Sequence, residues 1–148
     1  MAKYTSLLFC IVAASLAVVS AVTDEEKAAF HEAMEPIIAA CSAEHSVSEG
    51  DIKAAKELEN GDGIKPCFIG CIMKKTEVLD SNGLYDAEKG LSKLRPFVKS
   101  DEDYAKFESV AKKCLKVNDE PVSDGAAGCE RAKLVMACAI ENKAEIPI

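Results

Sequence analysis

Apolar residues recur every three or four positions along most of the chain, which is the spacing of one face of an α-helix. The pattern is clearest over residues 100–117, where five side chains share one face: Tyr104, Phe107, Val110, Cys114 and Val117. No stretch shows the sustained alternation of apolar and polar residues that is typical of a half-buried strand. The sequence therefore predicts an all-α protein without strands.

Capping residues and helix breakers divide this pattern into about six helices. Side chains that cap helix N-termini stand at Thr23, Ser48, Asp86 and Ser100. Pro66 suits the first turn of another helix, and turn-forming residues at 60–63 and 80–83 end the second and third. We expect five helices, over about residues 24–42, 48–58, 66–78, 86–94 and 100–117, and a sixth from about residue 124.

Two of these helices depart from the common amphipathic pattern. Pro36 lies inside the first and lacks a backbone donor, so we expect a kink there. After Lys133 the sixth reads Leu-Val-Met-Ala-Cys-Ala-Ile and has no polar face. Because a helix that is apolar all round is buried all round, we expect the sixth helix to run through the centre of the protein.

Residues 1–21 are typical of a secretory signal peptide. The apolar run from Leu7 to Val19 is shorter than the roughly 20 residues of a membrane span, and small residues precede the expected cleavage after Ala21. Residues 22–148 would then form a single domain, secreted into extracellular fluid. No second apolar stretch is long enough for an anchor, so we expect no stable membrane insertion.

Charge and motifs exclude several classes of function. A formal charge of −7 at pH 7 disfavours nucleic acid as a partner. The sequence has no nucleophile elbow, phosphate loop or calcium loop. His31 lacks the second histidine of a zinc-protease helix, and neither His31 nor His45 has the neighbouring aspartate of a secreted phospholipase. We therefore expect a binding protein without catalytic residues, metal or cofactor, and not an enzyme.

The cysteines provide the most specific pattern in the chain. Cys10 lies in the expected signal peptide, and the other six are separated by 25, 3, 42, 14 and 8 intervening residues: Cys41, Cys67, Cys71, Cys114, Cys129 and Cys138. An even set in a short secreted domain indicates disulfides. On helices, Cys67 and Cys71 point the same way, whereas Cys129 and Cys138 lie half a turn out of phase. These facts leave 15 pairings open.

This cysteine spacing, above all the two short gaps, resembles that of the six-cysteine insect odorant-binding proteins. The resemblance implies three disulfides, Cys41–Cys71, Cys67–Cys129 and Cys114–Cys138. It also implies about six helices around a central apolar cavity, and a secreted carrier that transports small hydrophobic ligands, such as odorants, pheromone-like or lipid-like molecules, through aqueous fluid. An odorant receptor is then a candidate partner, and we expect a monomer or a weak homodimer.

The resemblance further implies that apolar side chains of the first, third, fourth, fifth and sixth helices line the cavity. The expected ligand-binding residues are Phe30, Met34, Phe68, Ile72, Leu84, Leu91, Leu94, Phe97, Tyr104, Phe107, Val110, Leu134 and Met136. Among them Tyr104, together with Ser109, is the candidate for a hydroxyl that orients the ligand.

Two further hypotheses concern the cavity. The alternative function is a secreted, disulfide-linked helical interaction protein of non-olfactory secretions, with a filled or vestigial pocket. The chain has no Trp and only ten residues after Cys138, which favours a general carrier over a dedicated pheromone carrier. We also expect the final residues, Glu145 to Ile148, to close one mouth of the cavity, with both isoleucines against the helix over 100–117 and Glu145 bonded to a nearby donor.

Overall fold

The computed structural model describes residues 22–57 and 63–148. These residues form six α-helices and no strand, which confirms the all-α prediction. The α-helices are α1 (Asp24–His45), α2 (Glu49–Glu57), α3 (Pro66–Lys75), α4 (Ala87–Leu94), α5 (Asp101–Lys113) and α6 (Cys129–Glu141). Four short 3₁₀ helices connect or follow them: η1 (Arg95–Phe97), η2 (Cys114–Asp119), η3 (Gly125–Ala127) and η4 (Lys143–Glu145).

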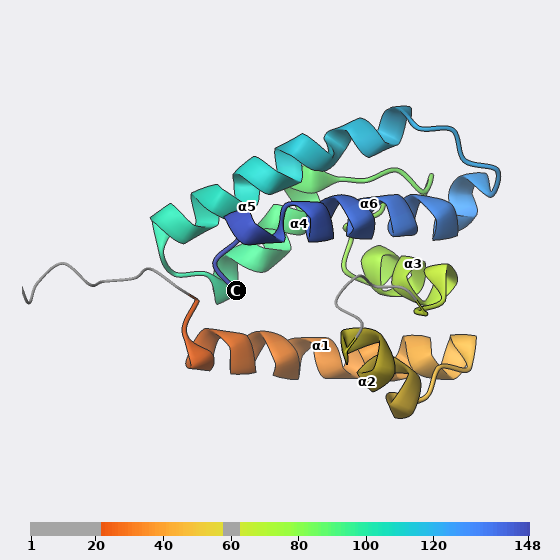
Figure 1. Cartoon of the computed structure of the whole chain (residues 1–148), viewed down its shortest axis with the longest axis horizontal. Coiled ribbons are helices and arrows are strands. Elements are labelled where there is room, and N and C mark those ends of the chain that lie inside the picture. The colour runs from red at the N-terminus through yellow and green to blue at the C-terminus, as the bar shows by residue number, and fades with distance from the viewer. Residues whose placement is uncertain (1–21, 58–62) are drawn as a thin grey trace, which may run out of the picture.

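Helix α6 lies between the other long helices. In Figure 1, α5 runs along one side of α6, and α3 lies on its other side, between α6 and α1. Helix α3 packs against α6 and α1, and α4 packs against α5. The core is formed where α1, α3, α6 and η2 meet, and its most buried residues include Cys41, Leu79, Cys114 and Ala132. The C-terminus lies near α4 and α5.

Local capping explains where several helices begin. Thr23 Oγ1 accepts a hydrogen bond from the backbone N–H of Glu26 at 3.2 Å, and a Glu26 carboxylate oxygen accepts one from the N–H of Thr23 at 2.8 Å. Ser48 and Asp51 form the same reciprocal pair at the start of α2. Because these contacts join residues three apart, the sequence alone predicted them.

The second oxygen of the Glu26 carboxylate does more than cap α1. It accepts a hydrogen bond from the backbone N–H of Lys99 at 2.8 Å, so that the start of α1 is joined to the segment between η1 and α5. The backbone N–H groups of Thr23 and then Lys99 lower the pKa of Glu26 below its usual value of 4.5. A single carboxylate thus links two segments that lie far apart in the sequence.

Two expected helix ends differ from the structure. Helix α1 continues through Pro36 as one helix and ends at His45, three residues beyond the expected residue 42. Helix α3 ends at Lys75, before Val78, because Glu77 has a left-handed backbone at φ 60°, with which an α-helix cannot continue. The last residue expected for α2, Leu58, and most of the turn expected to end it, residues 60–62, lie outside the described residues, as does the expected signal peptide, residues 1–21.

Two further boundaries differ near the C-terminus. The expected helix over 100–117 tightens at Cys114 into η2, and α6 begins at Cys129, after η3. Gly128, at φ 74°, separates η3 from α6 in the left-handed conformation that suits glycine. The prediction that α6 is buried all round was wrong, since Leu134 and Met136 are half-buried and Ala137 is exposed. In a domain this small, too few neighbouring elements exist to cover every face of a helix.

The three disulfides are the pairs that the family resemblance implied. Cys41–Cys71 joins α1 to α3, Cys67–Cys129 joins α3 to α6, and Cys114–Cys138 joins η2 to α6. They close loops of 30, 62 and 24 residues. In the chain-entropy account each restricts the unfolded chain by about 3–4.5 kcal/mol. They connect α1, α3, α6 and η2 into one covalently linked unit.

Candidate ligand-binding cavity

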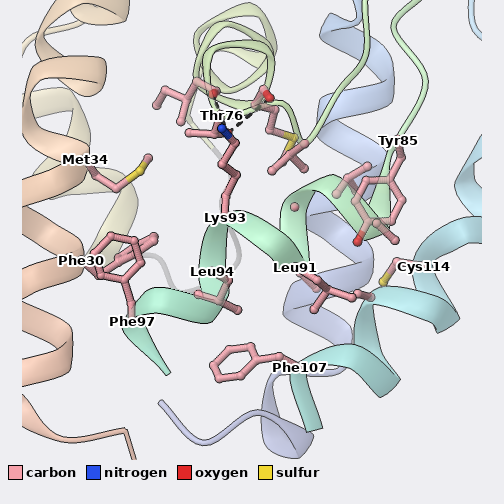
Figure 2. A pocket seen from close by; sticks show the side chains of 18 of the residues that line it. Phe30, Met34, Thr76, Tyr85, Leu91, Lys93, Leu94, Phe97, Phe107 and Cys114 are labelled. Atoms are coloured by element: carbon pink, nitrogen blue, oxygen red, sulfur yellow. Dashed lines mark hydrogen bonds between the residues drawn. The ribbon is translucent and has the colours of Figure 1, made fainter. Parts of the chain in front are cut away.

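A cavity of about 530 Å³ lies between this linked unit and helices α4 and α5 (Figure 2). Its wall is almost entirely apolar. The lining residues are Phe30, Ala33, Met34 and Ile37 of α1; Ile72, Met73, Lys75, Thr76 and Val78 of α3 and the segment after it; Tyr85, Ala87, Gly90, Leu91, Lys93, Leu94 and Phe97 on and around α4; and Phe107, Val110, Ala111, Cys114, Val135, Ala139 and Ile146 on the α5–α6 side.

Aromatic side chains form one end of the cavity. Phe30 of α1 and Phe97 of η1 meet edge to face, with ring centroids 5.5 Å apart and ring planes at 81°. This geometry is favourable for aromatic pairs. Phe30 is nevertheless 38 % exposed. Figure 2 shows the two rings together on the α1 side, with Met34 beside them. A noncovalent aromatic contact therefore joins α1 to η1 across this end.

The opposite wall is built on the disulfide-linked core. Val110 of α5 and Cys114 of η2 are buried and line this side of the cavity. Val135 of α6 lines it as well. The disulfide from Cys114 to Cys138 holds this chain against α6. The wall on this side consequently has little freedom to close into the cavity, which is how a small domain can keep an internal space.

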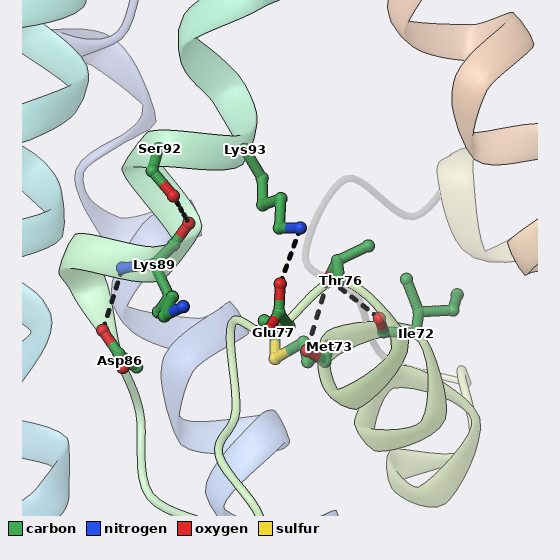
Figure 3. Close-up of polar contacts among 8 residues, drawn as sticks. All are labelled: Ile72, Met73, Thr76, Glu77, Asp86, Lys89, Ser92 and Lys93. Atoms are coloured by element: carbon green, nitrogen blue, oxygen red, sulfur yellow. Dashed lines mark hydrogen bonds and ion pairs between the residues drawn. The ribbon is translucent and has the colours of Figure 1, made fainter.

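The charged groups of the lining are engaged in ion pairs at its rim. Lys93 Nζ lies 2.6 Å from a carboxylate oxygen of Glu77, which joins α4 to the segment after α3 (Figure 3). Lys75 Nζ lies 3.0 Å from a carboxylate oxygen of Glu44 on α1. The hydrogen bond from Lys93, followed by its charge, lowers the pKa of Glu77. Because the four side chains are 40–57 % exposed, these pairs stand at the solvent boundary of the cavity.

The C-terminal residues meet the expectation for a closing segment only in part. Ile146 is half-buried and lines the cavity, and Glu145 forms an ion pair with Lys113 of α5. The carbonyl of Pro147 accepts a hydrogen bond from the N–H of Val22 at 3.4 Å. Ile148 is 75 % exposed, so the expectation that both isoleucines pack against α5 was wrong for this residue.

The comparisons with known proteins agree with this architecture. A model of the PBP/GOBP family matches residues 23–142, which is most of the described chain. The chain belongs to the PBP/GOBP family. It is 28 % identical over 110 residues to general odorant-binding protein 57c of Drosophila melanogaster. That match covers 69 % of this chain and 66 % of the relative, just under two thirds of the relative's length. No solved structure matches the chain significantly.

Membership of the PBP/GOBP family confirms the resemblance that the cysteine spacing indicated, and the family is one of binding proteins. Eight of the thirteen side chains expected to bind ligand line the cavity of this family member. They are Phe30, Met34, Ile72, Leu91, Leu94, Phe97, Phe107 and Val110. Their role in binding remains a prediction, but the structure brings them together around one space.

Five expected residues lie outside the lining. Phe68 is 3 % exposed and belongs to the packed core, although it is only one helical turn from Ile72. Leu84 lies on a turn and is 41 % exposed. Leu134 and Met136 pack against the core from α6. The ring of Tyr104 is covered by the guanidinium of Arg95, whose Cζ lies 4.7 Å from the ring centroid. Ser109, the other expected hydroxyl, is exposed and is likewise absent from the lining.

Several lining residues were not anticipated from the sequence. Ile37 shares a helical face with Phe30 and Met34, at spacings of seven and three residues, so the helical period could have found it. Val135 stands three residues before Cys138 on α6, so the helical period could have identified it as well. Tyr85 had none, because it lies outside the α-helices, where no period relates a residue to a common face.

The described residues also bring three potential metal-ligating groups together. Side-chain atoms of Glu44, His45 and Cys71 lie within 4.8 Å of one another. Cys71 Sγ is bonded to Cys41 Sγ, so it offers no thiolate, and zinc is bound by thiolates rather than by disulfides. We therefore assign no metal site to this cluster. None of the helices in the described parts of the chain is long and apolar enough to cross a membrane.

Proposed function

We propose that this protein is a secreted carrier that binds one small hydrophobic molecule in its cavity and transports it through extracellular fluid. The observation that carries the proposal is the cavity of about 530 Å³ with an almost wholly apolar wall. This volume lies in the range of small-molecule sites, which are mostly apolar and carry a few polar groups. An alternative interaction protein with a filled interior is disfavoured by the same volume.

Two features support the secreted location. The first 21 residues have the composition of a signal peptide, and disulfides such as the three described here persist in oxidising compartments. The relative's name, general odorant-binding protein, is consistent with odorants as the ligands. In this proposal the protein acts without catalysis, as a monomer or weak homodimer, and an odorant receptor is the recipient of the ligand.

The proposal is tested by titrating the mature protein, residues 22–148, with the apolar fluorescent probe N-phenyl-1-naphthylamine. We expect saturable uptake at micromolar concentration. Ala111→Phe, which places a ring into the cavity, is expected to weaken uptake at least tenfold, because it occupies space that the probe needs. Ala105→Phe is the matched control, since Ala105 is exposed on the same helix. Equal uptake by both variants, or no saturable uptake by the unaltered protein, would contradict the proposal.

A further inference from the structure

Tyr85 occupies a fixed position in the cavity wall. Its backbone N–H donates to Oδ1 of Asn118 at 2.9 Å, and its carbonyl accepts from Nδ2 of the same side chain at 2.9 Å. It also forms a bridge with Leu79 across the turn that precedes α4. These contacts secure the backbone from two sides, so the ring is carried by a well-anchored segment. The backbone at this position is therefore held in place before a ligand binds, which lowers the cost of ordering the site.

The hydroxyl of Tyr85 lies in apolar surroundings. Figure 2 shows the ring across the cavity from Phe30 and Met34, with the oxygen on the side of Leu91 and Cys114. Within residues 22–57 and 63–148 no other group forms a hydrogen bond with this oxygen. Burial, and secondarily the carboxylate of Asp86, raise the pKa of Tyr85 above its usual value of 10.0. The phenol thus keeps its proton at neutral pH and is available as a donor.

The other polar side chains of the lining are already engaged. The Thr76 hydroxyl donates to the carbonyl of Ile72 at 2.9 Å. The ammonium groups of Lys75 and Lys93 are paired with carboxylates at the rim. The charge of each ammonium group is already balanced by a carboxylate at the solvent-exposed rim, so an anionic ligand would gain little there, whereas a neutral oxygen would find a free donor at Tyr85. The lining therefore favours a neutral ligand.

We propose that Tyr85 donates a hydrogen bond to the ligand, and that the preferred ligands are neutral, mostly apolar molecules with one acceptor oxygen, such as ketones, aldehydes or esters. The inference rests on the proposed function and adds to it the chemical class of the ligand. The apolar wall supplies most of the affinity through buried area, and the hydroxyl selects for the oxygen and sets its position in the cavity.

The test compares two ligands of the same shape that compete with N-phenyl-1-naphthylamine. Octan-2-one carries a carbonyl where 2-methyloct-1-ene carries a methylene group, so only the acceptor differs. Tyr85→Phe removes the hydroxyl and keeps the ring. It is expected to weaken octan-2-one about 3- to 10-fold, as for loss of one neutral hydrogen bond, and to change the alkene less than 2-fold. Tyr104→Phe, the matched control outside the lining, is expected to leave both ligands unchanged.

The outcomes separate this inference from the proposed function. If Tyr85→Phe weakens ketone and alkene equally, or neither, while the probe still binds, the role of Tyr85 is overturned and the carrier function stands. Tighter binding of octanoate than of octan-2-one at pH 7 would overturn the neutral-ligand class. If the unaltered protein takes up no probe, the carrier function fails and the inference fails with it.

A second measurement does not depend on a folded variant. The infrared carbonyl band of ¹³C-labelled octan-2-one bound to the unaltered protein is expected at lower frequency than in an alkane solvent, because a hydrogen bond weakens the C=O bond. A band at the alkane position in the unaltered protein would overturn the role of the hydroxyl.

Discussion

The two sides of the cavity are held together by different forces. On one side, α1, α3, α6 and η2 are joined by three disulfides and share the buried core. On the other side, α4 and η1 have no cysteine, since none occurs between Cys71 and Cys114. That side is attached by the Phe30–Phe97 contact, the Lys93–Glu77 ion pair and packing on α5. The linked side is held by covalent bonds and the unlinked side by noncovalent contacts alone, so in the proposed carrier we expect the unlinked side to move when a ligand enters.

Residues from both the disulfide-linked side and the unlinked side line the same cavity. A cavity forfeits packing contacts, and the linked core offsets that loss through restriction of the unfolded chain. A noncovalent wall around an apolar space opens at lower free energy than a packed core does. Stability and access are thereby assigned to different parts of one small domain. Three predictions test this difference between the two sides, in order of decreasing expected effect on stability.

Removal of the Cys67–Cys129 disulfide should have the largest effect. The double variant Cys67→Ala/Cys129→Ala opens a loop of 62 residues, and we expect the free energy of unfolding to fall by about 4 kcal/mol in the chain-entropy account. Denaturant titration under non-reducing conditions measures this change. A loss below about 1 kcal/mol would mean that the packing between α3 and α6 holds this side without the covalent link.

Equal truncations on the two sides should have unequal costs. Leu79 is 2 % exposed in the core, so Leu79→Ala is expected to lower the free energy of unfolding by about 3 kcal/mol. Leu94 on α4 is half-buried and borders the cavity, so Leu94→Ala should cost about 1 kcal/mol, because part of its surface already faces open space. Thermal and denaturant unfolding of both variants checks this difference. Equal costs would show that the α4 side is packed as tightly as the core.

The smallest expected effect concerns pH. The pKa of Glu26 is lowered in the folded protein by the N–H groups of Thr23 and Lys99, so its carboxylate stabilises the fold above its unfolded pKa of about 4.5. That contribution is lost as the pH falls through the lower folded pKa. Glu26→Gln should therefore lose less thermal stability than the unaltered protein on acidification from pH 6 to pH 3. Glu32→Gln, at an exposed glutamate of the same helix, is the control. Identical pH profiles for Glu26→Gln and the unaltered protein would show that the Glu26 carboxylate does not stabilise the contact between α1 and the segment before α5.

Much of the fold could be predicted because its signals are local. The capping pair Thr23–Glu26 and the apolar spacing of Phe107 and Val110 involve residues three apart, and they identified α1 and α5. The cavity could be predicted only in part. On α3, Phe68 and Ile72 share a face by their spacing, yet Phe68 entered the core and Ile72 the cavity wall. Their surroundings differ because different distant segments pack against successive turns of the helix.

The sequence by itself determined the helical class, most helix starts and, through the resemblance carried by its cysteine spacing, the disulfide pairs. Each of these depends on contacts within one turn or on a pattern that can be counted along the chain. The tertiary structure alone decided that Tyr85 faces the cavity and that Tyr104 lies beneath Arg95. These positions depend on how segments far apart in the sequence meet, and hydrophobic contact is non-directional, so the apolar pattern does not specify which segments meet.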